Sequence, residues 1–249
     1  MKPVLTTREA VLLAGGLGTR LRSVIGSRPK VLVEVGGRVF LFRLLDALAS
    51  RGIQRVILAL GHGADQTLAA LRNWHSSLEV ETRIEATPLG TGGAMRHAAE
   101  VVRGESFFGL NGDSVAPFDF PGLEAALRRT NVAAIQVARV SDAARFGTVE
   151  FDHENILVGF REKTGNHAPG WISAGVYALD RRAFLSGSPE GAFSIEQDYF
   201  MKAPPGTIAV IPVEGDFIDI GTEESLACSA GVLDRLLGPE GEAGGTDGR

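Results

Sequence analysis

Cysteine is nearly absent from this sequence, because Cys228 is the only one among 249 residues. A single thiol excludes an internal disulfide framework and any metal site built from several thiolates. The five histidines do not occur at the spacings of zinc ligands, so we assign them no metal chemistry. One cysteine fits a reducing compartment, which predicts a cytoplasmic protein, and we expect Cys228 to lie buried on a late helix.

Long hydrophobic runs are also missing. No apolar segment reaches the roughly 18 to 20 residues that cross a bilayer, and the polar residues 1–9 do not resemble a signal peptide. Positive charge is not in excess, since 25 Lys and Arg stand against 30 Asp and Glu and give a net charge of -5. We therefore expect neither a membrane nor a nucleic acid as a partner.

Glycine, in contrast, is abundant. The chain has 32 glycines, where the average usage of roughly 7% would give about 17, and they show no three-residue period, which excludes collagen. With 44% hydrophobic residues the chain can bury a sizeable core, and its length fits one large domain over residues 1–237. Residues 238–249 contain five glycines and no aromatic residue, which predicts a disordered tail.

The hydrophobic pattern of the first half alternates between strand and helix. Residues 9–14 form an aliphatic run that stops at a glycine-rich turn, as a buried strand does. Further strands are expected at 53–60, 78–84 and 106–110, and helices at 40–50, 64–74, 92–102 and 121–130. This alternation predicts a parallel sheet that helices cover on both faces.

The second half has a different pattern. Short strands are expected close together at 132–140, 147–151, 156–160 and 171–179, as in a small antiparallel insertion. A helix at 194–201 and strands at 207–213 and 217–220 lead to a last helix at 223–237, which Thr222 caps. The expected fold class is therefore α/β, with a mostly parallel mixed sheet and a small antiparallel insertion.

The loop after the first strand has the composition of a phosphate-binding segment. Its glycines let backbone N–H groups approach phosphate oxygens, and Arg20 and Lys30 supply positive charge. A dinucleotide-binding motif does not fit, because Leu21 stands where its third glycine belongs. A Walker motif does not fit, because no Gly-Lys-Ser/Thr follows the glycines. Two or three of these glycines alone would be explained by a tight turn, but the whole string would not.

The segment GGLGTRLRSVIGSRPK, residues 15–30, resembles the signature of sugar-phosphate nucleotidylyltransferases, and the resemblance extends over about residues 10–237. It implies a Rossmann-like three-layer sandwich that transfers a nucleoside monophosphate from an NTP to a sugar 1-phosphate and releases pyrophosphate. It also implies that the loop and two cations hold the triphosphate: Leu13, Ala14, Gly15, Gly16, Gly18, Thr19, Arg20 and Lys30. In-line attack on the α-phosphorus needs no covalent nucleophile, so catalysis would depend on positioning and charge.

Two aspartates are candidate metal ligands. Asp113 follows the strand expected at 106–110 and Asp219 lies at 217–220, so both stand near the edge where open α/β sheets bind ligands. The resemblance places metal-binding aspartates at these two positions, and Mg²⁺ held by carboxylates and substrate phosphates is the expected cofactor. From the residues alone, Asp113 is equally explained as a turn residue and Asp219 as a residue of helix entry.

The segment EATPLGTGGA, residues 85–94, resembles the base-reading loop of the family and adds four residues to the expected nucleotide site: Glu85, Pro88, Gly90 and Thr91. Uridylyl and thymidylyl members carry Gln at the position of Glu85, and an amide offers one donor and one acceptor. A carboxylate offers only acceptors, which match the N1–H and 2-amino donors of guanine, so we expect GTP. A solvated charge at a strand end is the alternative explanation of Glu85.

The sugar site is expected from short segments of the second half. Glu162 and Lys163 match the family's Phe-x-Glu-Lys, in which Glu binds sugar hydroxyls and Lys binds the sugar phosphate, although an exposed hairpin pair has the same sequence. Ser173 stands where many members have Asn, so its contact departs from the pattern. The expected set is Asn111, Gly112, Glu162, Lys163, Ser173, Gly175 and Glu196.

Within the family, these segments are most similar to guanylyltransferases that act on D-glycero-D-manno-heptose 1-phosphate. Mannose 1-phosphate guanylyl transfer and glucose 1-phosphate uridylyl or thymidylyl transfer are the alternatives, and a homo-oligomer is a family expectation. A glycosyltransferase would carry a closely spaced Asp-x-Asp, whereas residues 111–113 contain one carboxylate. A catalytically silent nucleotide-binding subunit would have no electrostatic reason to retain the four charged residues Arg20, Lys30, Asp113 and Asp219.

Overall fold

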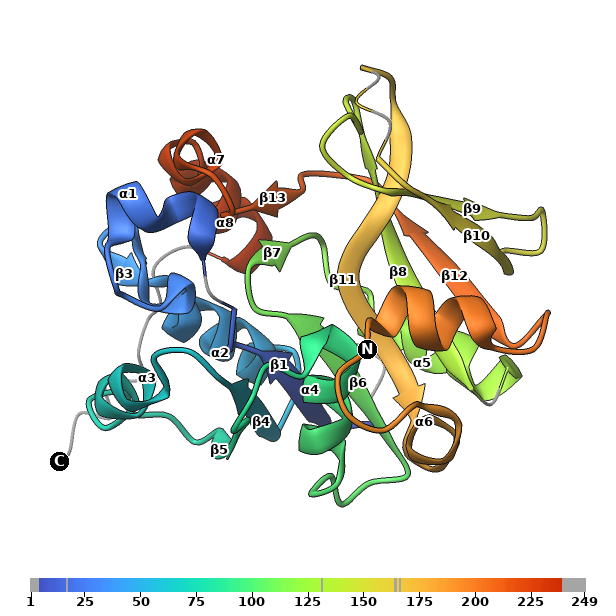
Figure 1. The fold of residues 1–249 in the computed structure, drawn as a ribbon, viewed down its shortest axis with the longest axis horizontal. Coiled ribbons are helices and arrows are strands. Elements are labelled where there is room, and N and C mark those ends of the chain that lie inside the picture. The colour runs from blue at the N-terminus through green and yellow to red at the C-terminus, as the bar shows by residue number, and fades with distance from the viewer. Residues whose placement is uncertain (1–4, 17, 131, 164, 166, 239–249) are drawn as a thin grey trace, which may run out of the picture.

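The computed structural model describes residues 5–16, 18–130, 132–163, 165 and 167–238, so the expected tail lies outside the described residues except for Gly238. The core of the fold is a nine-stranded sheet (Figure 1). Its strands are β1 (Glu9–Leu13), β4 (Arg55–Leu60), β5 (Glu79–Ile84), β6 (Ser106–Asn111), β8 (Ala133–Val140), β9 (Thr148–Phe151), β10 (Leu157–Arg161), β11 (Gly170–Asp180) and β12 (Ile208–Val213). Two small sheets pair β2 (Glu34–Val35) with β3 (Arg38–Val39) and β7 (Ser114–Val115) with β13 (Ile218–Asp219).

The helices fall between these strands, largely where the hydrophobic pattern predicts them. They are α1 (Arg22–Ile25), α2 (Phe40–Ser50), α3 (Ala64–Leu71), α4 (Gly90–Ala99), α5 (Phe120–Thr130), α6 (Arg181–Gly187), α7 (Glu223–Ala227) and α8 (Ser229–Leu237). Short 3-10 turns are η1 (Thr19–Leu21), η2 (Lys30–Leu32) and η4 (Phe200–Lys202), and η3 (Ile195–Tyr199) is a π turn. No helix in the described ranges has the length and apolar character needed to span a membrane.

The order of strands creates the place for a site. Strand β1 pairs in parallel with β4 on one side and with β6 on the other, and β4 pairs in parallel with β5. The chain therefore builds outward from β1 to β5 and then returns to β6 across β1. The loops that follow β1 and β6 leave in different directions, and such a switch point opens a crevice at the carboxyl ends of the strands.

The antiparallel strands expected in the second half are present, and they extend the same sheet. Strand β11 runs antiparallel to both β6 and β8, and the β9–β10 hairpin joins its first residues. Strand β12 is parallel to β8 and completes this side. The mixed α/β sheet predicted from the sequence is confirmed.

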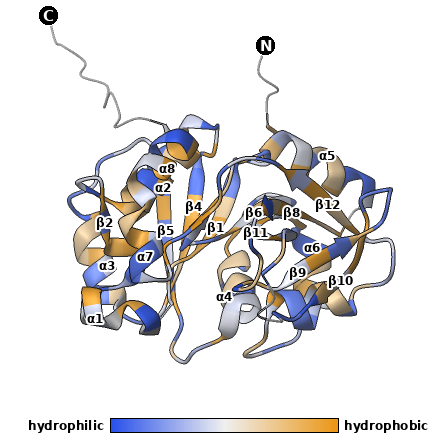
Figure 2. Ribbon diagram, turned by 90° about the horizontal axis from the view of Figure 1, so that it is seen from above, coloured by the Kyte–Doolittle hydropathy of each residue, from blue (hydrophilic) through white to orange (hydrophobic). Residues whose placement is uncertain are grey.

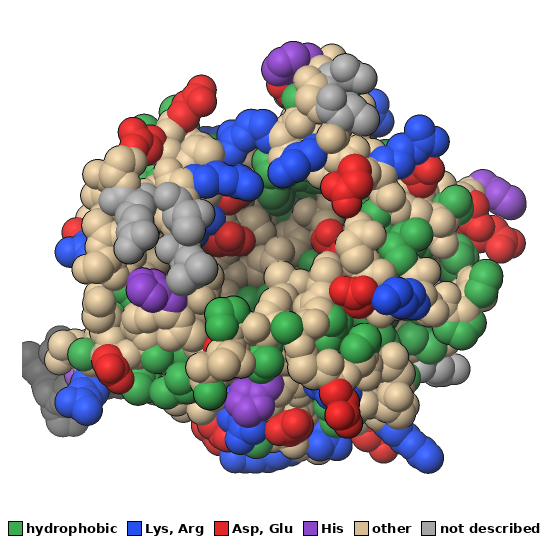
Figure 3. Space-filling view, in the orientation of Figure 1, with side chains coloured by type: hydrophobic (Ala, Val, Ile, Leu, Met, Phe, Trp, Pro, Cys, Tyr) green, Lys and Arg blue, Asp and Glu red, His purple; other side chains and the backbone are tan. Residues whose placement is uncertain are grey.

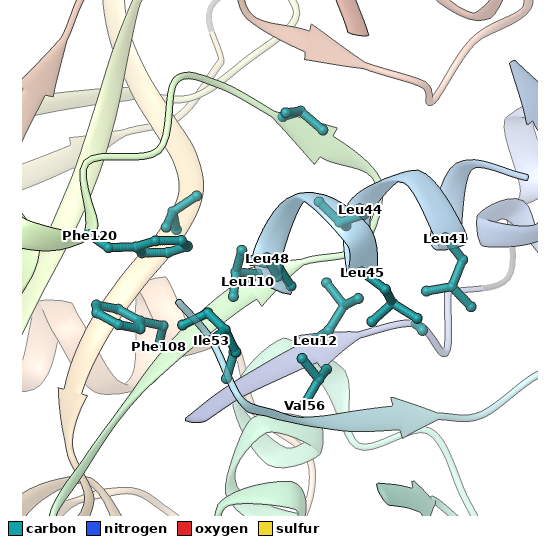
Figure 4. Packing of buried hydrophobic residues seen from close by; sticks show 14 of the residues in the cluster. Leu12, Leu41, Leu44, Leu45, Leu48, Ile53, Val56, Phe108, Leu110 and Phe120 are labelled. Carbon is teal, nitrogen blue, oxygen red and sulfur yellow. The ribbon is translucent and has the colours of Figure 1, made fainter. Parts of the chain in front are cut away.

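Helices cover both faces of the sheet, because side chains of each strand alternate between two cores. In β1, Leu12 belongs to the core that includes α2, α5 and α8, whereas Val11 belongs to the core that includes α4 and α6. Figure 2 shows α2 and α5 on one side of the strands and α4 on the other. The apolar stripe of α2 places Leu41, Leu45 and Leu48 against Leu12 (Figure 4). Each such buried leucine stabilises the fold by about 1.5 to 3 kcal/mol.

Three details differ from the pattern. The last helix is divided into α7 and α8, because Cys228 has φ −90° and ψ 0° at the end of α7. Cys228 is exposed at this junction and not buried, which corrects the expectation. Helix α6 was not predicted, although Asp180 before it is a capping residue whose side chain accepts the Ala183 N–H at 2.7 Å.

Candidate active site

A pocket of about 330 Å³ opens at the carboxyl ends of β1 and β6, where the strand order predicts a crevice. Most residues expected to bind the nucleotide line it: Leu13, Gly15, Gly16, Lys30, Glu85, Pro88, Gly90 and Thr91. The rest of the lining is Val31, Ala59, Ala94, Asn111, Gly112 and Asp113. The face of the molecule drawn in Figure 3 is hollowed, and acidic and basic side chains gather around the hollow. Segments far apart in the sequence therefore form one cavity.

Glycines let the backbones of this pocket lie close together. A Cβ atom at Gly112 would overlap the carbonyl oxygen of Leu13, and a Cβ atom at Gly15 would lie 2.8 Å from the backbone nitrogen of Gly61. Any side chain at these positions would push the first loop away from the strands beside it. Gly15, expected in the phosphate-binding loop, and Gly112, expected on the sugar side, thus allow close contact of the loops.

Lys30 lies between the two aspartates that the sequence proposes as metal ligands. Its ammonium group is 2.9 Å from Asp113 Oδ2 and 3.4 Å from Asp219 Oδ1. Strand β13 brings Asp219 to this place, because Asp219 pairs with Ser114 of β7 and the Ile220 N–H donates to the Asp113 carbonyl at 2.9 Å. Lys30 itself is buried on η2, so its charge is held at a fixed position.

The two carboxylates fit a hard divalent cation. Both contact the same ammonium group, so their charges converge on one point; Lys30 and Asp113 line the pocket, and Asp219 lies beside it. The described ranges contain no cluster of three or more His, Cys, Asp and Glu side chains that could hold a metal. One or two carboxylates completed by substrate phosphates is an arrangement typical of Mg²⁺.

Among the described side chains of the first loop, three predicted residues do not line the pocket: Arg20, Ala14 and Gly18. Arg20 is exposed on η1, and Ala14 is buried beneath the loop. Gly18 has a φ of 56°, a value that glycine adopts without strain. The Thr19 side chain lies outside the described part of the structure. The structure therefore brings Lys30 and the aspartates together but leaves Arg20 outside this group.

Glu85 lines the pocket and also holds its own loop. Its Oε2 atom accepts the Leu89 N–H at 3.1 Å, and its backbone N–H donates to the Leu60 carbonyl at 2.9 Å. These bonds fix the carboxylate at the end of β5 and shape the loop from Glu85 to Leu89. Each carboxylate oxygen has two acceptor sites, so Glu85 retains capacity for donors of a ligand.

Asn111, at the end of β6, lines the pocket and carries an acceptor that is unpaired among the described residues. Its Oδ1 atom is buried and has no hydrogen-bond partner within the described part of the chain. Gly175, with a φ of 69°, makes room for the amide, since a Cβ atom there would lie 2.6 Å from Asn111 Nδ2. Buried polar atoms are normally paired, so this unpaired oxygen beside the pocket is an exception among the described residues.

A second pocket of about 360 Å³ contains most of the residues expected on the sugar side. Glu162, Lys163, Ser173 and Glu196 all line it, together with Arg145, Phe146, Gly147, Phe160, Arg161, Ile172 and Gln197. Sequence reasoning missed Arg145, whose guanidinium lies 5.7 Å from the centre of the Phe146 ring. An arginine beside an aromatic residue in a loop has no distinctive sequence signal. Asn111 and Gly112, also expected here, line the first pocket.

Glu196 lies in an environment that favours its protonated form. Burial raises the pKa of Glu196, and the charge of Glu162 adds to the effect, while hydrogen bonds from Ser173 and Tyr177 oppose it. The net direction of the pKa is upward. Perturbed carboxyl groups are frequent in binding and catalytic sites, which supports a functional role for this pocket.

Comparison with known proteins shows which family this chain is similar to. Residues 9–226 match the nucleotidyl transferase family. A D-glycero-alpha-D-manno-heptose 1-phosphate guanylyltransferase of Campylobacter jejuni is 30% identical over 216 residues, which cover 87% of this chain and 96% of the relative. A mannose-1-phosphate guanylyltransferase of Mycobacterium tuberculosis is 32% identical over 246 residues, 93% of this chain and 66% of that protein.

The fold is also similar to solved structures. HddC from Yersinia pseudotuberculosis has a TM-score of 0.81 and 32% identity, covering 91% of this chain and all of that one. A second HddC structure, complexed with GMP-PN, has a TM-score of 0.80. Sequence match, fold and the assembled pocket agree: the chain belongs to the nucleotidyl transferase family.

Proposed function

We propose that this protein is a sugar 1-phosphate guanylyltransferase, which transfers GMP from GTP to a sugar 1-phosphate and releases pyrophosphate. The observation that carries the proposal is the pocket at the switch point of the sheet. It joins the glycine-rich loop to Glu85 and ends at Lys30, which lies between Asp113 and Asp219. Such a pocket has a place for a base, for phosphates and for a cation.

The reaction forms one bond and breaks one. A phosphate oxygen of the sugar 1-phosphate attacks the α-phosphorus of GTP, and the bond from the α-phosphorus to the β-phosphate oxygen breaks. The Lys30 ammonium stabilises the negative charge that grows on the phosphates, and the first loop orients the phosphates with its backbone N–H groups. A magnesium ion, when bound by Asp113 and Asp219, supplies further neutralisation.

For the sugar, we propose D-glycero-D-manno-heptose 1-phosphate. The heptose-specific relative is matched over nearly its whole length, whereas the mannose-specific relative has additional sequence beyond the match. The lining of the second pocket suits a sugar phosphate, because Lys163 and Arg145 offer cations and Glu162 and Glu196 offer acceptors for hydroxyl groups. Mannose 1-phosphate is the second candidate, favoured by a sequence identity of the same size.

A cytoplasmic location is part of the proposal. The exposed free thiol of Cys228 supports this location, because such thiols persist in a reducing compartment. Expression of the tagged protein followed by cell fractionation tests the location, and recovery from an oxidising compartment contradicts it.

The decisive experiment measures pyrophosphate release with each common NTP and a panel of sugar 1-phosphates, with Mg²⁺ and with a chelator. We expect turnover with GTP and heptose 1-phosphate, none after chelation, and a clear loss in Asp113→Asn and in Asp219→Asn. A preference for UTP or dTTP overturns the guanylyl assignment. Full activity of both aspartate variants overturns the metal site, and an absence of turnover with every pair overturns the reaction.

A further inference from the structure

The base loop and the second pocket are joined by one short segment, residues 193–197. The Phe193 N–H donates to the Leu89 carbonyl at 2.9 Å, and the Gly92 N–H donates to the Phe193 carbonyl at 2.9 Å. Four residues later in the chain, Gln197 lines the second pocket together with Glu196. A displacement of the base loop therefore moves part of the lining of the other pocket.

Glycines of the base loop make this contact possible. A Cβ atom at Gly92 would overlap the ring of Phe193, and one at Gly90 would lie 2.6 Å from the Phe193 carbonyl oxygen. Gly90 also has a φ of 69°, which side chains disfavour. Phe193 is buried in this contact, so the segment packs on the loop and does not merely lie near it.

Thr91 provides the one side-chain hydrogen bond of this junction within the described residues. Its Oγ1 atom accepts the Ile195 N–H at 3.1 Å. Ile195 is 1% exposed and begins the π turn η3, and Ser194 caps that turn by accepting the Gln197 N–H at 3.3 Å. The acceptor on Thr91 therefore fixes the residue that immediately precedes Glu196.

The position of Glu196 in the second pocket follows from this anchored turn. Glu196 and Ser173 of β11 line the same pocket, and the Ser173 hydroxyl lies 3.4 Å from the Tyr177 hydroxyl of the same strand. The distance between a substrate hydroxyl and this carboxylate depends on the π turn, and a binding group is effective only when its support holds it in place.

We propose that Thr91 is a positioning residue for Glu196. Its hydroxyl anchors the π turn, and this anchoring sets the affinity of the second pocket for the sugar 1-phosphate. This assignment differs from the nucleotide contact expected of Thr91 from sequence. It rests on the proposed function in that the second pocket is taken to bind the sugar 1-phosphate. Binding in the second pocket is thereby coupled to the loop that faces the base.

The first test compares Thr91→Val, which removes the acceptor, with Thr91→Ser, which retains it. For Thr91→Val we expect the KM for the sugar 1-phosphate to rise about five- to tenfold, the effect of one hydrogen bond, and to rise by more than the KM for GTP, whose pocket Thr91 also lines. Thr91→Ser should restore the wild-type KM. A rise confined to the GTP KM, or an unchanged sugar KM in Thr91→Val, overturns the proposal.

A double-mutant cycle asks whether Thr91 acts through Glu196. Glu196→Gln should raise the sugar KM by itself, and adding Thr91→Val to it should have little further effect, because the anchored group is already altered. Additive effects of the two substitutions contradict the proposed route.

A measurement without substrate separates this inference from the proposed function. Hydrogen exchange of the backbone amides of residues 193–197 should be about five- to tenfold faster in Thr91→Val than in wild type, with Thr91→Ser unchanged and α2 equally protected in all three. If no sugar 1-phosphate supports turnover but the exchange changes, the anchoring stands and the sugar assignment fails. Unchanged exchange in this segment overturns the anchoring itself.

Discussion

Lys30 and its two aspartates have an unfavourable net charge for binding a nucleotide. One ammonium faces two carboxylates, Asp113 and Asp219, which leaves one negative charge where a triphosphate must bind. A divalent cation would change the local sum to plus one, so on the proposed function we expect the reaction to require a metal ion. The same sum explains why an acidic protein can bind an anion at this place.

Removal of the Lys30 ammonium tests its part in catalysis. Lys30→Met keeps the length of the side chain, and we expect kcat to fall by about 10² to 10³, the range found when one preorganised electrostatic contact is removed. Arg38→Met removes the cation of the Arg38–Asp46 pair outside the pocket and should leave kcat unchanged. Steady-state pyrophosphate release measures both, and a Lys30 variant within threefold of wild type would refute the assignment.

On the proposed function, Glu85 determines which nucleotide base the enzyme prefers. In Glu85→Gln an amide oxygen remains to accept the Leu89 N–H, so the loop is retained, but one acceptor becomes a donor. We expect kcat/KM for GTP to fall about ten- to a hundredfold, because a hydrogen bond to a charged group is replaced by a donor facing a donor. The ratio of GTP to UTP turnover measures the change, and an unaltered ratio shows that Glu85 does not contact the base.

At the scale of elements, a buried charge cluster joins the amino ends of β1, β4 and β5. Arg55 is 4% exposed and pairs with Glu9, Glu79 and Glu81, one partner or more on each neighbouring strand. The cluster lies at the opposite end of these strands from the pocket, since Arg55 begins β4 and Leu60 ends it. Its role is therefore structural.

Arg55→Leu should destabilise the fold without changing the chemistry. Loss of the guanidinium leaves Glu9 without its buried partner, and breaking a buried ion pair costs about 3 to 5 kcal/mol; we expect the lower end, because Glu79 and Glu81 are partly exposed. Arg103→Leu, at an exposed partner of Glu79, should cost less than about 1 kcal/mol. Urea unfolding measures both, and equal losses in the two variants would contradict the role of burial.

At the scale of the whole molecule, Glu124 connects the segment before β1 to α5, the helix that packs on β8, β11 and β12. It accepts the Thr6 N–H at 3.0 Å and the Thr7 N–H at 2.6 Å. Burial favours the neutral acid, but these hydrogen bonds and the charge of Arg128 outweigh it, so the pKa of Glu124 lies below its ordinary value.

This lowered pKa predicts how stability depends on pH. The folded protein binds the Glu124 proton more weakly than the unfolded chain does, so the contribution is complete above the ordinary pKa of about 4.3 and is lost as pH falls through the lower folded value. Glu124→Gln should be less stable at neutral pH and lose less stability on acidification. Urea unfolding from about pH 7 to pH 3 measures it. Glu190→Gln, at an exposed position, should show the same dependence of stability on pH as the wild type. A Glu124→Gln curve parallel to that of the wild type would contradict the prediction.

Elements with a strong local pattern could be predicted from the sequence. The stripe of leucines in α2 and the continuous apolar run of β4 gave nearly the observed bounds, because burial follows periodicity. The helix expected at 194–201 is instead the π turn η3 followed by the 3-10 turn η4, and the break at Cys228 interrupts the helix expected at 223–237. The distant residue Thr91 holds η3, so no local pattern predicts the form of this turn. Residue types of the candidate site were identified, but the contact of Lys30 with both aspartates needs the pairing of β7 with β13, which no local pattern encodes.

The break between α7 and α8 has a practical consequence. It exposes the single thiol of the chain, Cys228, so a maleimide fluorophore would attach at one defined position without any engineered cysteine. Helix α7 begins directly after the loop that follows Asp219, and the dye would therefore sit on the element next to that carboxylate. The sequence thus offers an optical probe of whether β13 and α7 move when the ligands of the proposed function, GTP and magnesium, are added.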